Sequence, residues 1–121
     1  MPRILIVDDE TNIALSLEFL LKNAGYEVAV ATDGEQALAC AASFAPDLVV
    51  LDVMLPVIDG LEVCRRLRRA PAHAAAKILF LTARGRAHAD EHVLEAGADA
   101  CMTKPFATQE LLARVRDLLG D

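Results

Sequence analysis

Five polar residues of this sequence close, or directly follow, a short apolar segment. They are Asp8, Asp9, Asp52, Thr82 and Lys104. Short apolar runs bounded by charged residues are typical of strands that are buried on both faces, as in a parallel sheet. Because the carboxyl ends of parallel strands form one edge of the sheet, we expect the five side chains to converge there. Carboxylates, a hydroxyl and an ammonium group in one place could act together on a charged ligand.

The three carboxylates of this group determine which chemistry is favoured. Carboxylates crowded at one site repel one another, so they stay ionised only if a cation neutralises them. Because the group contains no His or Cys, Mg²⁺ is favoured over zinc. A magnesium site with a spare carboxylate suits phosphoryl transfer. Asp52 would then be the nucleophile, while Lys104 and Thr82 would bind phosphoryl oxygens. Taken singly, an Asp after a strand is more often a turn or cap residue.

Composition and charge exclude several other classes of protein. The chain has 121 residues, 55% hydrophobic and 25% charged, which predicts one soluble globular domain with a single core. No apolar run approaches the ~18 residues of a membrane span, so we expect a cytoplasmic protein. Its cysteines, Cys40, Cys64 and Cys101, lack metal-site spacing and are predicted to be reduced. A net charge of −6 argues against direct nucleic-acid binding by this domain.

Five strands and five helices are predicted in alternation along the chain. The strands are expected at 3–8, 27–31, 47–52, 77–82 and 99–103. The first helix is expected from a cap at Thr11 or Asn12 to Gly25, the second from the cap Asp33 to before Pro46, and the third from the cap Asp59 to about Arg69. The fourth is expected between the loop after Ala83 and Gly97, with Val93, Leu94 and Ala96 as its apolar positions, and the fifth over Leu111 to Leu119. Right-handed crossovers between such strands predict a three-layer α/β sandwich.

The third predicted helix carries four arginines. Arg65, Arg66, Arg68 and Arg69 are expected on its outward side as a solvated face, with a docking patch for an acidic partner as the alternative.

Several motifs occur together in order along the chain. They are Ile-Val-Asp-Asp-Glu at 6–10, Asp-Val-Met-Leu-Pro at 52–56, Asp-Gly at 59–60, Leu-Thr-Ala at 81–83, Gly-Ala-Asp at 97–99 and Thr-Lys-Pro-Phe at 103–106. Through them the chain resembles the receiver domain of two-component response regulators over essentially its whole length, residues 1–121. The resemblance implies a flavodoxin-like (βα)5 fold with a five-stranded parallel sheet of order 2-1-3-4-5.

The resemblance also implies a function and a set of site residues. Asp52 is expected to accept a phosphoryl group from a histidine kinase or a phosphotransfer protein. Asp9, Asp52 and the backbone carbonyl of Met54 are expected to ligate Mg²⁺, with Asp8 acting through water. Lys104 should precede a cis peptide bond to Pro105. The chain would be no conventional enzyme, since it would catalyse only its own phosphorylation and slow dephosphorylation.

Phosphorylation is expected to switch the face formed by the fourth helix, fifth strand and fifth helix, near Ala83, Cys101 and Pro105. A homodimer could form through that face.

Two positions depart from the family pattern. Cys101 replaces the Tyr or Phe that usually responds to phosphorylation, and Ala100 replaces a second Asp that is usual in the winged-helix branch. We therefore expect a weak aromatic switch and a dimer lacking one ion pair.

Three other classes of protein fit the sequence less well. A haloacid-dehalogenase-like phosphatase would need a second Asp where the chain has Met54, and a cap domain. A flavodoxin would need a Ser/Thr-rich phosphate loop where Asp8, Asp9 and Glu10 would repel the flavin phosphate. A degenerate receiver that acts only as a protein-interaction module is the main structural alternative, although all five acceptor-site residues are present.

Overall fold

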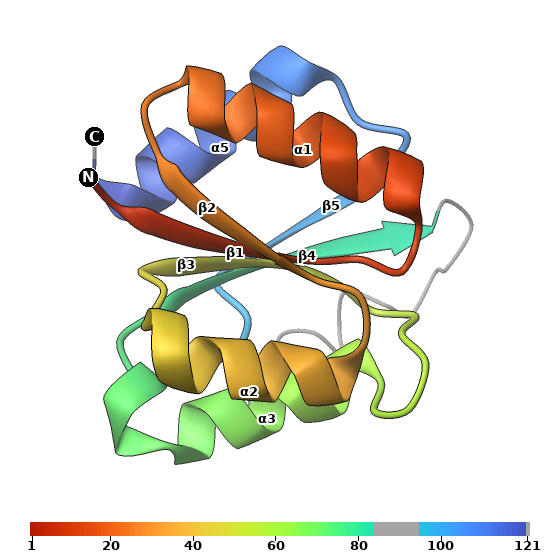
Figure 1. Ribbon diagram of the computed structural model, residues 1–121, viewed down its shortest axis with the longest axis vertical. Helices are drawn as coiled ribbons and strands as arrows, with labels where there is room; N and C mark the ends of the chain where they lie inside the picture. Colours follow the sequence, from red (N-terminus) through yellow and green to blue (C-terminus); the bar gives the residue numbers. More distant parts are fainter. Residues whose placement is uncertain (84–94, 121) are drawn as a thin grey trace.

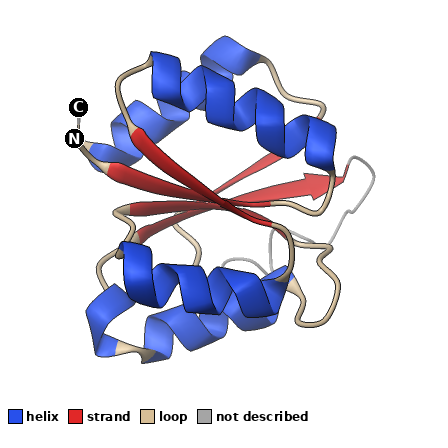
Figure 2. Cartoon of the chain, in the orientation of Figure 1, coloured by secondary structure: helices blue, strands red, loops and turns tan. Residues whose placement is uncertain are grey.

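The computed structural model describes residues 1–83 and 95–120, which form a parallel five-stranded sheet between two helical layers (Figures 1 and 2). The strands are β1 (Arg3–Val7), β2 (Glu27–Ala31), β3 (Leu48–Asp52), β4 (Lys77–Ala83) and β5 (Ala100–Lys104). The helices are α1 (Thr11–Asn23), α2 (Gly34–Phe44), α3 (Gly60–Arg69), the short 3₁₀ helix η1 (Pro71–His73) and α5 (Thr108–Leu119). The strand order β2-β1-β3-β4-β5 confirms the predicted flavodoxin-like fold. The predicted loop after Ala83 and the helix positions Val93 and Leu94 lie outside the described residues.

Alternating side chains of the central strands supply two separate apolar clusters. Leu5, Val49 and Phe80 belong to the cluster that includes residues of α2 and α3, whereas their neighbours Ile4 and Leu79 belong to the cluster that includes residues of α1 and α5. Figure 1 shows these two pairs of helices on opposite faces of the sheet. Burying each such side chain contributes about 1.5–3 kcal/mol. Because both faces are covered, the strands read as continuous apolar runs, and their polar residues are confined to the strand ends.

The helix starts agree with the predictions in two cases and differ in one. The side chain of Asp33 accepts a hydrogen bond from the Gln36 amide at 2.8 Å, and Asp59 accepts one from the Glu62 amide at 2.9 Å. Both are N-caps of the expected kind. The prediction of a cap at Thr11 or Asn12 is wrong, because α1 already begins at Thr11. Its N-cap is Glu10, which makes no side-chain capping bond.

The arginines of α3 divide into two groups, so the prediction of one solvated face is wrong for Arg68. The side chains of Arg65, Arg66 and Arg69 surround Glu62 on the surface. The Arg68 guanidinium instead donates to the carbonyls of Gly97, Ala74 and Ala76 and to the Asp99 carboxylate. The side chain of Arg68 is only 21% exposed, because its long stem lets the charged group reach these partners.

Within residues 1–83 and 95–120, no helix has the length and apolar character needed to cross a membrane.

Candidate functional site

The carboxyl ends of β1, β3 and β5 bring two buried carboxylates onto one lysine. Asp8 follows β1, Asp52 ends β3 and Lys104 ends β5. The Nζ atom of Lys104 lies 3.0 Å from Oδ2 of Asp8 and 3.1 Å from Oδ2 of Asp52. Such charge-assisted hydrogen bonds are stronger than neutral ones and fix the lysine at the sheet edge. The predicted convergence of strand-end side chains is therefore present for these three residues.

Asp52 is held at both carboxylate oxygens and is 5% exposed. Its Oδ1 accepts a hydrogen bond from the Met54 amide at 3.1 Å, while Oδ2 accepts from Lys104. Burial raises the pKa of Asp52 above its ordinary value, and the nearby Lys104 and Met54 donors offset that rise only in part.

The surroundings of Lys104 shift its pKa in the direction that keeps the side chain protonated. Burial alone would lower the pKa of Lys104, but the carboxylates of Asp8 and Asp52 together raise it above the ordinary value. The lysine is therefore a fixed cation at neutral pH.

A small acidic pocket of about 210 Å³ opens beside Asp52. It is lined by Asp9, Glu10, Asp52, Met54 and Lys104. Carboxylate oxygens of Asp8, Glu10 and Asp52 lie within 4.8 Å of one another, and the side chain of Asp9 is outside that set. All the donors are hard oxygen atoms, and the carboxylates carry more negative charge than the single positive charge of Lys104 can neutralise. The group therefore fits a divalent cation such as Mg²⁺.

Glu10 was not predicted as a site residue, although it belongs to the motif at 6–10. Its amide donates to Oδ1 of Asp8 at 2.9 Å, and its Oε1 lies 3.4 Å from Nζ of Lys104. The bond from Asp8 to the amide two residues on is an Asx turn, which brings Glu10 back over the strand end. A turn-forming Asp two residues before an acidic residue was the available signal in the sequence.

The chain after Asp52 is packed closely enough to require a glycine. The Gly60 amide donates to the Val53 carbonyl at 2.9 Å. A Cβ atom at Gly60 would lie 2.1 Å from the Asp52 carbonyl oxygen. The first turn of α3 therefore sits directly against the backbone of Asp52, which explains the Asp-Gly pair at 59–60.

The loop between Asp52 and Gly60 contains a strained turn. The Ile58 amide donates to the Pro56 carbonyl at 2.8 Å across Val57, whose φ is +71°. This hydrogen bond closes a three-residue γ-turn, and the sign of φ makes it the rare, strained form. Val57 is β-branched and 74% exposed, so no buried contact of its side chain compensates the strain.

Thr82 and Cys101 lie together on the adjacent strands β4 and β5. The buried Thr82 hydroxyl donates to the Met102 carbonyl at 3.5 Å, and the Cys101 Sγ lies 3.9 Å from Thr82 Oγ1. The hydroxyl is thus directed to β5 rather than to Asp52. Ala83 is in register with Lys104 across the β4 and β5 pair. Of the predicted switch residues, Ala83 and Cys101 therefore lie on two adjacent strands that end at the site, and Pro105 directly follows β5.

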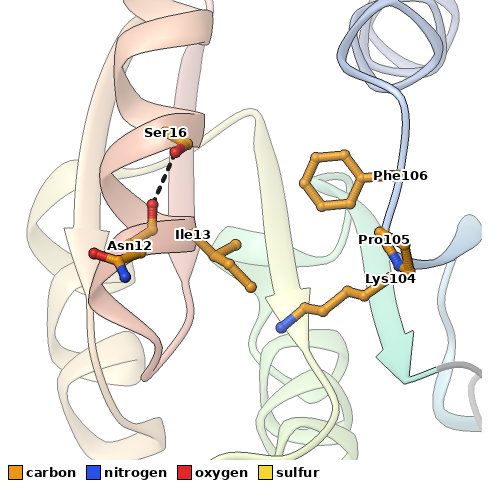
Figure 3. Close-up of a pocket in the computed structure, with 6 residues that line it drawn as sticks. All are labelled: Asn12, Ile13, Ser16, Lys104, Pro105 and Phe106. Atoms are coloured by element: carbon orange, nitrogen blue, oxygen red, sulfur yellow. Dashed lines mark hydrogen bonds between the residues drawn. The ribbon is translucent and has the colours of Figure 1, made fainter.

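A second, more apolar cleft of about 280 Å³ adjoins the acidic pocket. It lies between the start of α1 and the segment that follows β5, and is lined by Asn12, Ile13, Ser16, Lys104, Pro105 and Phe106 (Figure 3). The predicted cis bond between Lys104 and Pro105 is present. In Figure 3 the side chain of Ile13 and the ring of Phe106 face the cleft, while the Lys104 stem runs along its edge. Lys104 lines both the cleft and the acidic pocket, so the two are neighbours that share this residue.

Comparisons with known proteins agree with this geometry. Residues 4–116 match the family model for the response regulator receiver domain. The DNA-binding dual master transcriptional regulator RpaA of Synechocystis sp. is 47% identical over 119 residues, which are 98% of this chain and 49% of RpaA. The chain thus spans about half the length of the curated relatives it matches.

Solved structures match over the full length. A protein of Chloroflexus aurantiacus J-10-fl is 43% identical, with a TM-score of 0.94 and complete coverage of both chains. The receiver domain of a sensor histidine kinase from Pseudomonas aeruginosa PAO1, whose crystal structure has a magnesium ion coordinated in the active site cleft, is 31% identical with a TM-score of 0.91, covering 99% of this chain and 98% of that one.

Proposed function

The chain belongs to the receiver-domain family of response regulators, and we propose that Asp52 is its phospho-acceptor. The single observation that carries the proposal is the buried Asp52 carboxylate, held 3.1 Å from a lysine at the mouth of an acidic pocket. A carboxylate oxygen of Asp52 attacks the phosphorus of a phosphohistidine, an oxygen–phosphorus bond forms and the phosphorus–nitrogen bond breaks. The leaving imidazole takes up a proton.

Three residues of the chain act on the transferred group in this proposal. Lys104 neutralises a phosphoryl oxygen, and the Met54 amide holds the second Asp52 oxygen in place. Thr82 must turn its hydroxyl from the Met102 carbonyl toward the phosphoryl group. That movement is the proposed link from phosphorylation to the face formed by β5 and α5.

Mg²⁺ is the proposed cofactor, and it would be held by Asp9, Asp52 and the Met54 carbonyl, with Asp8 acting through water. When bound, it supplies positive charge for the phosphoryl oxygens. The acidic pocket, which Asp9 and Asp52 line, holds more carboxylates than cations, and this excess supports a divalent cation there.

The proposed partner is a histidine kinase or phosphotransfer protein that docks beside the pocket in the cytoplasm. Two large apolar residues of α1, Leu15 and Phe19, are 56% and 71% exposed and lie four positions apart on one side of the helix. Together with the cleft of Figure 3 they offer an apolar surface next to Lys104. A partner seated there would bring its phosphohistidine to the acidic pocket.

A homodimer through the face that includes β5 and α5 stays a proposal, and part of that face lies outside the described residues.

The test is incubation with phosphoramidate and Mg²⁺, read by intact mass. We expect a gain of one phosphoryl group in the wild-type chain and none in Asp52→Asn. Asp47→Asn is the matched control, because Asp47 precedes the same strand at its opposite end. It should gain mass like the wild type. Equal mass gain in Asp52→Asn would refute the assignment, and no gain in any form would favour a module that only binds proteins.

A further inference from the structure

The ammonium group of Lys104 has no donor left for a phosphoryl oxygen. A lysine ammonium carries three N–H donors. Its Nζ lies 3.0 Å from Asp8, 3.1 Å from Asp52 and 3.4 Å from Glu10, and each of these contacts is to a carboxylate oxygen. Three donors therefore face three acceptors. An oxygen of the phosphoryl group that approaches Asp52 can be bound by Lys104 only after one of these contacts is released.

The three contacts differ in how easily they can be released. The side chains of Asp8 and Asp52 are 1% and 7% exposed, so either would lose a hydrogen bond without gaining water. The side chain of Glu10 is 60% exposed, and its contact is the longest. Water can replace Lys104 at Glu10 at little cost, since exposed ion pairs contribute little net free energy.

The backbone of Glu10 is fixed independently of this contact. Its amide donates to Asp8 at 2.9 Å, and its carbonyl accepts from Ala14 at 3.0 Å as the first bond of α1. The Glu10 carboxylate can therefore turn away from Lys104 while the strand end and the helix stay in place.

We propose that Glu10 is a positioning residue that competes with the phosphoryl group for Lys104. In the unphosphorylated chain it occupies the third donor of the ammonium. As the phosphoryl group approaches Asp52, its oxygen takes that donor and Glu10 turns into solvent. This inference rests on the proposed phosphorylation of Asp52. Loss of the Glu10 contact should make Lys104 available sooner and speed phosphorylation by about 1.5- to 5-fold, the range that an exposed ion pair supports.

Two substitutions separate contact from charge. Glu10→Gln removes the charge and weakens the bond to Lys104. Glu10→Asp keeps the charge, but its side chain is one methylene shorter and withdraws from a contact that is already 3.4 Å long. Glu35→Gln, an exposed carboxylate in the first turn of α2, is the control for net charge alone. Each full chain is assayed with phosphoramidate at saturating Mg²⁺ by intact mass against time.

A second readout needs no phosphorylation. The Mg²⁺ dissociation constant of each chain is measured by calorimetry without phosphodonor, because Glu10 also belongs to the carboxylate set that could hold a metal. The proposal expects faster phosphorylation in both Glu10 variants, the wild-type rate in Glu35→Gln, and Mg²⁺ affinity within about twofold of wild type in Glu10→Asp.

Each other outcome overturns the proposal in a recognisable way. Acceleration in Glu10→Gln alone would assign the effect to charge at the pocket mouth. A tenfold loss of Mg²⁺ affinity in Glu10→Asp would make Glu10 a metal ligand. Unchanged rates in both variants, with normal phosphorylation of the wild type, would overturn this inference alone. A wild-type chain that gains no phosphoryl group would overturn the proposed function as well.

Discussion

Arg68 and Asp99 form an ion pair that joins α3 to the start of β5, with 2.6 Å between Nη2 and Oδ2. The same Asp99 oxygen accepts the Ile78 amide at 2.8 Å, so one carboxylate links α3, β4 and the turn before β5. The Gly97 backbone packs against the Arg68 stem, because a Cβ there would lie 2.8 Å from Arg68 Cγ. Arg68 is therefore a structural residue near the amino ends of β4 and β5, and its guanidinium is engaged within the chain.

Replacing Arg68 with Ala should lower the free energy of unfolding by about 2 kcal/mol, because a partly buried Asp99 carboxylate and three carbonyls lose a charged donor. Urea unfolding followed by circular dichroism measures the change. Arg69→Ala is the matched control: its side chain is 69% exposed and should cost less than about 0.5 kcal/mol. Equal losses in the two variants would contradict the structural role of Arg68.

Val57→Gly should stabilise the chain by about 1 kcal/mol. Glycine adopts a positive φ without the strain that a β-branched residue carries, and this gain exceeds the added entropy of the unfolded chain. Val57→Ala keeps a Cβ at the same φ of +71° and should gain less. Thermal unfolding of the three chains ranks them, and a lower melting temperature for Val57→Gly would show that the turn is not strained.

The raised pKa of the Cys64 thiol predicts that the folded chain loses stability in alkali. Burial raises the pKa of Cys64 from 9.0 to about 11, and its Sγ donates to the Ala96 carbonyl. The folded chain holds this proton more tightly than the unfolded chain, so stability falls as pH rises from 9 toward 11. The loss should reach about 2 kcal/mol. Cys64→Ala removes this group, so urea unfolding at pH 7.5 and pH 10.5 should show a smaller decrease. An equal decrease in both chains would contradict the prediction.

Cys101→Tyr should enlarge the response of β5 to phosphorylation. The native thiol already touches Thr82 at 3.9 Å and is too small to fill the space that Thr82 vacates. Hydrogen exchange with and without beryllofluoride and Mg²⁺ should show, in the native chain, changes concentrated at residues 83–97 and little change at Cys101. Cys101→Ala, which lacks the ring, is the control. Strong β5 changes in the native chain, or no gain from Tyr, would contradict a weak switch.

The sheet and most of the site were predictable because the strands of a parallel sheet, when both faces are covered, must be apolar except at their ends. Buried on both faces, residues such as Leu51 and Phe80 had to be apolar, so Asp52 and Lys104 stood out at the strand ends. The strand order was available only through resemblance to the family.

The features that were missed depend on side-chain reach and on local turns. Glu10 is brought to the site by an Asx turn. Arg68 was expected on a solvated face because of its charge, but its guanidinium bonds to backbone carbonyls of the chain. The strain at Val57 arises from one hydrogen bond between its neighbours, and the hydrophobic pattern contains no sign of it.

The two apolar clusters on opposite faces of the sheet share its backbone but no side chain. Leu79 and Phe80 are consecutive, yet each packs in a different layer. Volume changes in one layer therefore do not have to be matched in the other. In evolution or in design, the layer under α2 and α3 can be repacked as an independent unit, while the layer that carries α1 and α5 keeps its shape.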